Sequence, residues 1–148
     1  RLVTVAVGTN DPGNAGTLVR VSDALGADAV IFAGDTVDPQ SSKAVRASAG
    51  SVFHVPVARS RDVGEVLRLL KSRGLQLMAT AADGEVDLGM ANELLARPTA
   101  WLFGNEAHGL GPELMELADH RVAIPIKGSA ESLNLATAAS ICLWESSK

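Results

Sequence analysis

The stretch that decides the fold lies near the end of the chain, where residues 124–134 read Ile-Pro-Ile-Lys-Gly-Ser-Ala-Glu-Ser-Leu-Asn. An apolar run expected to be a strand, Arg121–Ile124, leads into it, and an Ala-rich segment expected to be a helix, Leu133–Glu145, leads out of it. A loop between a parallel strand and the next helix lies at the carboxyl edge of the sheet, where open α/β sheets bind ligands. The stretch therefore predicts an α/β sheet with a candidate site at its edge.

Two other loops share this composition and this position. Residues 8–16 read Gly-Thr-Asn-Asp-Pro-Gly-Asn-Ala-Gly, and residues 103–111 read Phe-Gly-Asn-Glu-Ala-His-Gly-Leu-Gly. Each follows a short apolar run and precedes a stretch of helical period. Three such loops at one sheet edge predict a single functional site built from distant parts of the chain.

Short β-branched runs alternate with helical stretches along the whole chain, which is the pattern of a parallel sheet built from βαβ units. We expect strands at 3–7, 29–32, 52–57, 75–80, 100–103 and 121–124, and helices at 15–25, 41–49, 63–73, 91–95, 112–118 and 133–145. Asn14, Ser41 and Ser132 are expected to cap helices. No repeat or linker interrupts the pattern, which predicts one α/β domain over residues 1–148.

Composition limits the function classes. With 148 residues and 47% hydrophobic content, the chain can bury one sizeable core. A net charge of -4 provides no global positive field for nucleic acid or an anionic membrane. An aromatic content of 3% leaves few rings on which unpaired bases could stack.

The charge is unevenly distributed along the chain. Between Ser41 and Arg73, seven basic residues stand against two acidic ones, a local charge of +5. The basic residues are Lys43, Arg46, Arg59, Arg61, Arg68, Lys71 and Arg73. This basic segment is expected either to contact an RNA backbone or to be an ordinary solvated surface, in which Lys and Arg stems cover apolar groups.

Several familiar chemistries lack their residues. Asn14 stands where a P-loop beginning at Gly8 needs its lysine, and the three histidines are scattered without metal-ligand spacing, so no metal is expected. The single cysteine, Cys142, is typical of a reducing compartment and predicts a cytoplasmic protein. The longest apolar segment, Leu133–Trp144, is too short for a membrane span, so no membrane partner is expected.

The three loops together resemble the motifs of a known family. The pattern Asn-Pro-Gly-Asn-x-Gly-x-x-x-Arg, matched at residues 14–20 and in the Pro-Gly before them, is the first motif of the SpoU (TrmH-like) class of SPOUT RNA 2'-O-ribose methyltransferases, which this chain resembles. Residues 103–109 and residues 124–134 are similar, in order, to the other two motifs of that class. The one departure in the first motif is Asp11, where Asn is common. The resemblance spans essentially the whole chain and implies one SpoU-type catalytic domain, a parallel-sheet α/β knot with a deep C-terminal trefoil knot.

The resemblance implies S-adenosyl-L-methionine as the cofactor, bent into the knot and held largely by backbone groups. The matching positions are Thr80, Ala81, Gly104, Ile124 and Leu133. Small and apolar residues at these positions suit a site in which the main chain reads an adenine ring.

The implied reaction is methyl transfer to a ribose 2'-hydroxyl, a weak nucleophile that must lose a proton and be aligned. By resemblance, the catalytic residues are Arg20, Asn14, Glu106, Ser132 and Asn134. Arg20, oriented by Glu106, would act on the hydroxyl as a base or, because arginine normally stays protonated, would hold a phosphate or stabilise the alkoxide. The structural alternatives are helix capping for the Asn and Ser side chains, a turn contact for Glu106 and an ion pair with Asp23 for Arg20.

Structured RNA and a second copy of the chain are the implied partners. Ribosomal, 23S-type RNA is favoured over tRNA, because the start at Arg1 suggests that an N-terminal substrate-binding domain is missing. The final helix is apolar all round, which predicts burial on both sides and a homodimer. The alternatives are a tRNA ribose 2'-O-methyltransferase, a non-catalytic knotted domain that binds RNA or cofactor, and a different α/β enzyme with a nucleotide ligand.

Overall fold

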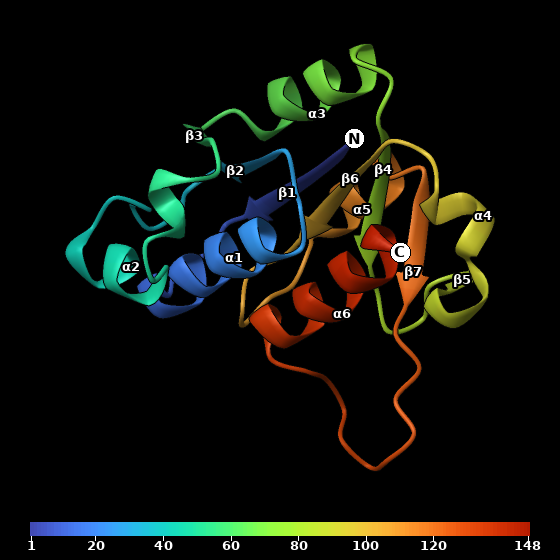
Figure 1. Cartoon of the computed structure of the whole chain (residues 1–148). Coiled ribbons are helices and arrows are strands. Elements are labelled where there is room, and N and C mark those ends of the chain that lie inside the picture. The colour runs from blue at the N-terminus through green and yellow to red at the C-terminus, as the bar shows by residue number, and fades with distance from the viewer.

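Seven parallel strands form a single sheet in the computed structural model, which describes residues 1–148 (Figure 1). The strands are β1 (Leu2–Val7), β2 (Ala29–Ala33), β3 (Val57–Ser60), β4 (Gln76–Thr80), β5 (Val86–Asp87), β6 (Thr99–Phe103) and β7 (His120–Ala123). Their order is β3-β2-β1-β6-β4-β7-β5, and every neighbouring pair is parallel. The predicted parallel α/β sheet is confirmed, with β5 as a short strand that the sequence pattern did not indicate.

Helices cover both faces of this sheet. They are α1 (Pro12–Ala24), α2 (Ser42–Ala47), α3 (Val63–Ser72), α4 (Asn92–Leu95), α5 (Pro112–Leu117) and α6 (Leu135–Ser147), with short 3-10 helices η1 (Ser51–Phe53) and η2 (Leu88–Met90). α1, α2, α4 and α6 pack on one face, and α3 and α5 pack on the other (Figure 1). None of these helices combines the length and the apolar character needed to cross a membrane.

Side chains along each strand alternate between two cores. In β1, Val5 lies in the core beneath α3, whereas Ala6 lies in the core beneath α1 and α6. The α1 side also holds Trp101, whose indole Nε1–H donates a hydrogen bond to Ser146 Oγ at 2.8 Å. Because both faces are covered, the strands read as nearly continuous apolar runs.

The strand predicted at residues 52–57 is wrong over most of its length. The 3-10 helix η1 occupies Ser51–Phe53, and β3 begins only at Val57. Val52 and Val55 are buried in the core on the α1 side. Their apolar character therefore comes from packing beneath a helix, which a short sequence pattern does not distinguish from strand pairing.

The first helix begins at Pro12 rather than at the predicted Ala15. Its N-cap is Asp11, whose Oδ1 accepts a hydrogen bond from the Gly13 N–H at 2.8 Å. Pro12 fills the first helical position, where a backbone N–H would have no intrahelical partner. Asn14 therefore lies inside the first turn, and its predicted capping role is wrong.

α1 and α2 approach each other closely at Gly16. A Cβ atom at this position would lie 2.6 Å from the Ala47 Cβ and would also overlap the Ala44 carbonyl oxygen. Only a glycine lets the two helix backbones come this near. The contact holds α2 against the N-terminal half of α1, beside the carboxyl edge of the sheet.

Replacing Gly16 with Ala should lower the free energy of unfolding by about 1 to 3 kcal/mol, the usual cost of overpacking a close contact. The direction of the change distinguishes Gly16 from an ordinary helical glycine, because replacing Gly with Ala elsewhere in a helix raises the free energy of unfolding by up to about 1 kcal/mol. Urea unfolding measures the difference. The matched control is Gly64→Ala in α3, where the nearest atom belongs to the flexible Arg68 side chain, at 3.2 Å, and stability should hold or rise. Equal stability of Gly16→Ala and the native chain would contradict the close approach.

Candidate functional site

Four loops meet at the carboxyl edge of the sheet. They follow β1, β4, β6 and β7 and span residues 8–11, 81–85, 104–111 and 124–134. β1 and β6 are neighbours, but the chain leaves β1 toward β2 on one side and leaves β6 toward β7 on the other. Open α/β sheets form their binding crevice at such a reversal. The site edge predicted from the three motifs is the edge at which these loops gather.

Hydrogen bonds join the loop after β1 to the loop after β6. Asn105 Nδ2 donates to the Gly8 carbonyl oxygen at 2.7 Å. The Glu106 carboxylate accepts from the backbone N–H groups of Asn10 and Asp11, at 3.2 and 3.3 Å. Glu106 therefore holds the first motif loop by its backbone and forms no hydrogen bond or ion pair with Arg20, whose orientation it was predicted to set.

Asn105 is a structural residue of this site that the sequence motifs did not single out. Besides its bond across to the first loop, its Oδ1 accepts from the N–H groups of Ala107 and His108, at 2.7 and 3.0 Å. One amide side chain thus shapes the turn after β6 and fixes its distance from the loop after β1. The available signal was the tendency of Asn to hydrogen-bond the backbone two residues on.

Gly104 allows the loop after β6 to fold back closely on itself. A Cβ atom at Gly104 would lie 2.7 Å from the Gly109 carbonyl oxygen, so the loop folds back directly onto this position. Gly109 itself adopts a positive φ of 62°, in the left-handed region that favours glycine. Gly104 is buried and does not line the cavity described next.

An open cavity of about 160 Å³ lies between the turn after β4 and the segment after β7. Most of its lining is apolar. Among its lining residues are Thr80, Ala81, Val122, Ile124, Ser132 and Leu133. The structure therefore brings four of the five residues expected to hold the cofactor around one cavity, together with one of the expected catalytic residues.

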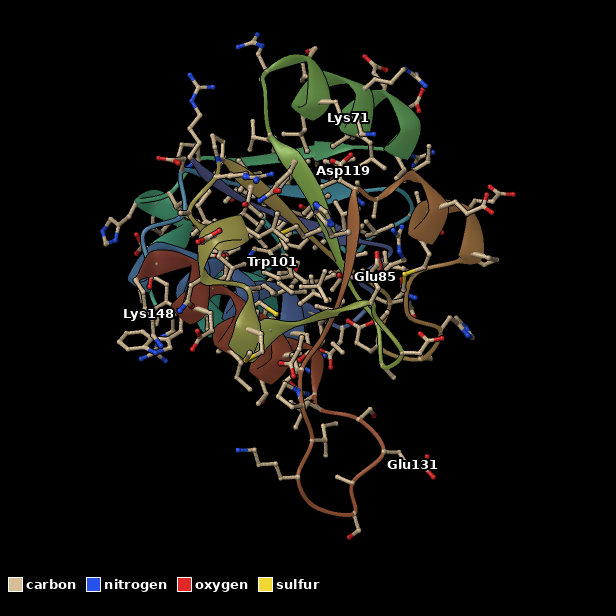
Figure 2. The ribbon with its side chains drawn as sticks, turned by 90° about the vertical axis from the view of Figure 1, so that its right-hand side faces the viewer. Lys71, Glu85, Trp101, Asp119, Glu131 and Lys148 are labelled. Atoms are coloured by element: carbon tan, nitrogen blue, oxygen red, sulfur yellow. The ribbon has the colours of Figure 1, made fainter.

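The segment after β7 offers its backbone to a ligand. It projects from the body of the molecule between β7 and α6, and Figure 2 labels Glu131 within it (Figures 1 and 2). No backbone N–H or C=O group of residues 124–133 forms a hydrogen bond within the chain. A cavity wall with free donors and acceptors and small or apolar side chains fits a ligand that is recognised by main-chain groups, such as a nucleoside.

Asn134, and not Ser132, caps the last helix. Asn134 Oδ1 accepts from the N–H groups of Ala136 and Thr137, at 2.9 and 3.3 Å. The predicted cap at Ser132 is wrong, and Ser132 is exposed at the cavity wall instead. Helix capping, the structural alternative expected for Asn134 from its residue type, is the role that the structure shows.

Arg20 is exposed on α1 and has no ion pair or side-chain hydrogen bond. The predicted alternative, an ion pair with Asp23, is not formed, and the Asp23 carboxylate lies 3.4 Å from His54 Nδ1 instead. Since α1 begins at Pro12, Arg20 stands about 12 Å further along the helix axis. Arg20 does not line the cavity, nor does half-buried Asn14 in the first turn.

All seven residues of the basic segment are exposed, but they do not form one stripe. Arg59 Nη2 donates to the Thr36 carbonyl oxygen at 2.7 Å, beside the carboxyl edge of the sheet. Lys71 lies 3.5 Å from Asp119, just before β7 begins and therefore at the opposite edge (Figure 2). Exposed Asp35 and Asp38 lie in the loop that follows β2, so the positive charge near the site is smaller than the sequence count.

No cluster of three or more His, Cys, Asp and Glu side chains is placed to hold a metal ion. The thiol of Cys142 is buried within α6, and this burial raises its pKa far above the ordinary value. The thiol therefore stays protonated at neutral pH and offers no nucleophile.

Comparison with known proteins extends over nearly all of this chain. The profile of the SpoU rRNA Methylase family matches residues 1–144. A 23S rRNA (uridine(2479)-2'-O)-methyltransferase of Streptomyces viridochromogenes is 39% identical over 137 residues, which cover 90% of this chain and 48% of that protein. The chain spans about half the length of the curated relatives it matches.

Solved structures match the fold as a whole. An AdoMet-bound rRNA methyltransferase from Sinorhizobium meliloti superimposes with a TM-score of 0.91 at 39% identity, covering 99% of this chain and 55% of that one. A structure that concerns 2-OH methylation of C/U34 on tRNA superimposes with a TM-score of 0.88 at 29% identity, covering 98% of this chain and 93% of that one. The seven-stranded sheet is therefore shared with proteins named for rRNA and for tRNA.

Replacing Asn134 with Ala should lower the free energy of unfolding by about 1 kcal/mol, because the first N–H groups of α6 lose their side-chain acceptor. Asn134→Asp keeps the acceptor and should keep the stability. Urea unfolding of the two variants measures the cap. An unchanged midpoint for Asn134→Ala would show that the hydrogen bonds to Ala136 and Thr137 contribute nothing.

Proposed function

The chain belongs to the SpoU rRNA methylase family, and from this premise we propose that it is an S-adenosyl-L-methionine-dependent RNA methyltransferase acting on a ribose 2'-hydroxyl. The observation that carries the proposal is the cavity between the turn after β4 and the segment after β7. It collects most of the residues that the family resemblance assigns to the cofactor, on loops at the edge where α/β sheets bind ligands.

The cavity suits a cofactor with a nucleoside part. The apolar side chains of Ile124 and Leu133 would flank an adenine ring, and the free backbone groups of residues 124–133 would bind its polar edge. Thr80 adds a hydroxyl at the end of β4. The bound cofactor supplies an electrophilic methyl group, and the chain supplies the shape and the hydrogen bonds that orient it.

Arg20 is proposed to act on the RNA. Its guanidinium is exposed and unpaired, so its donors are free for a phosphate or for the charge that develops on the ribose oxygen. A general-base role is disfavoured because arginine stays protonated. Glu106 would hold the loop that leads into α1, and Ser132 would contact the substrate from the cavity wall.

Ribosomal RNA of the 23S type is the proposed substrate class. Its support is the name of the Streptomyces relative, a 23S rRNA methyltransferase, at 39% identity. tRNA is the second candidate, because the structure concerned with C/U34 of tRNA is matched over 93% of its length. A domain that binds RNA or cofactor without turnover is disfavoured by the presence of Arg20, Glu106 and Asn134.

Further features of the family remain part of the proposal. A homodimer is supported by Phe53 and Trp144, which are 78% and 56% exposed and lie on elements packed against α1. A C-terminal trefoil knot is supported by family membership and by the close approach of the turn after β4 and the segment after β7. We also propose that residues 1–148 form the catalytic domain, in the cytoplasm.

Incubation with methyl-labelled S-adenosyl-L-methionine and total bacterial RNA should label RNA, and nuclease digestion should release the label as a 2'-O-methylated nucleoside. Arg20→Ala should abolish transfer, because the substrate loses its cationic contact, while calorimetry shows cofactor affinity within a few-fold of the native value. Arg97→Ala, which removes an exposed arginine near the opposite sheet edge, is the matched control and should retain turnover.

Separating the labelled RNA by size distinguishes 23S-type RNA from tRNA as the substrate. Native turnover by Arg20→Ala would remove Arg20 from the site. Cofactor binding without label in any RNA would favour the non-catalytic alternative.

Reversing Arg61 and Arg68 to Glu should weaken RNA binding and leave cofactor binding unchanged, because both side chains are exposed near the carboxyl edge. Each phosphate contact that is lost should lower the slope of log affinity against log salt by about 1. Filter binding across a salt series measures both effects. Arg73→Glu, at the far end of α3, is the matched control. Equal losses in the two variants would indicate a nonspecific charge effect.

A further inference from the structure

An ion pair joins Arg121, in β7, to Glu85, in the turn that follows β4. Arg121 Nε donates to Oε1 and Oε2 of Glu85 at 2.9 and 3.0 Å, and Nη2 donates to Oε1 at 2.6 Å. The backbone N–H of Arg121 donates to the same carboxylate at 3.2 Å. Figure 2 labels Glu85 beside β7. Such a forked arrangement fixes the direction as well as the distance between the two groups.

The other end of the same guanidinium holds α5. Arg121 Nη1 donates to the carbonyl oxygens of Met115 and Ala118, at 2.6 and 2.9 Å. These carbonyls belong to the end of α5, where helices lack intrahelical donors. Arg121 therefore connects three parts of the chain: β7, the turn after β4 and the helix that follows the second motif loop.

The turn after β4 lies directly on β7. The Ala81 N–H donates to the Val122 carbonyl oxygen at 2.9 Å, and the Gly84 N–H closes the turn onto the Ala81 carbonyl oxygen at 3.1 Å. A Cβ atom at Gly84 would lie 2.6 Å from the Arg121 carbonyl oxygen. Since Ala81 and Val122 both line the cavity, the placement of this turn sets the position of one cavity wall.

We propose that Arg121 and Glu85 are positioning residues for the cofactor cavity. Neither side chain lines the cavity, so both act through the turn at residues 81–85. The ion pair between Arg121 and Glu85, here called the clamp, holds this turn against β7. The identity of the ligand rests on the proposed function, whereas the clamp itself rests on contacts within the chain. The sequence motifs include neither residue, and the two charges are 36 positions apart in the chain.

The clamp is ionised throughout the neutral range. The hydrogen bonds from Arg121 lower the pKa of Glu85 to about 2. A folded-state pKa below the ordinary value of 4.5 means that the pair contributes fully above that pH and is lost as pH falls toward 2. The side chains of Arg121 and Glu85 are 33% and 48% exposed, so geometry rather than burial is what makes this contact specific.

The test compares Glu85→Gln and Arg121→Lys with the native chain. Each change removes part of the fork, so the KM for S-adenosyl-L-methionine should rise about tenfold, comparable to the loss of one charge-assisted hydrogen bond. Because neither residue touches substrate, kcat at saturating cofactor and the KM for RNA should stay near native values. Lys148→Gln breaks a different exposed ion pair, with Glu145 at the C-terminal end of α6, and should leave all three constants unchanged.

A second measurement needs neither ligand nor turnover. Amide hydrogen exchange at Ala81 and Gly84 should be faster in Glu85→Gln than in the native chain, while exchange at Gly8, bonded to Ala33 at 3.0 Å, stays the same. Native exchange rates at Ala81, an unchanged cofactor KM, or a loss confined to kcat would each overturn the proposal. A native chain that fails to bind cofactor would refute the proposed function, and the exchange experiment would still decide the clamp.

Discussion

All seven strands run parallel, so every carboxyl end lies at the same edge of the sheet, and this constraint determines where the candidate site lies. Parallel neighbours cannot be joined by a tight turn, so each connection must cross the sheet over a longer path. The crossovers supply the helices that cover both faces, and their return points supply the loops. Four loops from distant parts of the chain therefore face one another before any side chain at the edge makes a contact.

Short contacts then adjust this arrangement. Asn105 sets the spacing of the loops after β1 and β6, and Arg121 sets the spacing of the turn after β4 against β7. Both use planar groups with several donors or acceptors, which fix orientation as well as distance. The cavity wall after β7 differs, because its backbone is left free for a ligand. At this edge, the loops after β1, β4 and β6 are held by hydrogen bonds within the chain, whereas the segment after β7 keeps its backbone groups free for a ligand.

Most of the fold could be predicted from the sequence, because buried parallel strands leave continuous apolar runs and the helices between them keep their period. The third motif loop also carried the cavity residues Ile124 and Ser132, and the family resemblance pointed to Thr80. The strand expected at 52–57 failed for a physical reason. Val52 and Val55 are as buried as strand residues, but beneath a helix, and burial alone does not report the partner.

Helix caps and ion pairs were harder to predict from the sequence than the strands and helices themselves. Asp11 and Asn14 are both good N-cap types, and only the position of Pro12 distinguishes them. Asn134 and Ser132 pose the same choice before α6. The pairing of Arg121 with Glu85 requires the strand order, since β4 and β7 become neighbours only in the folded sheet. Sequence patterns describe neighbours along the chain, whereas these interactions depend on neighbours across the sheet.

The position of β1 has a consequence for how the chain matures during synthesis. β1 lies between β2 and β6, so the first half of the chain can assemble β3, β2 and β1 while β6 has not yet left the ribosome. Until residues 99–103 emerge, the outer side of β1 is an open strand edge with unpaired backbone groups and apolar side chains. Open edges of this kind pair readily with other chains. Production of this protein should therefore be most sensitive to crowding and temperature in the interval between translation of β3 and translation of β6.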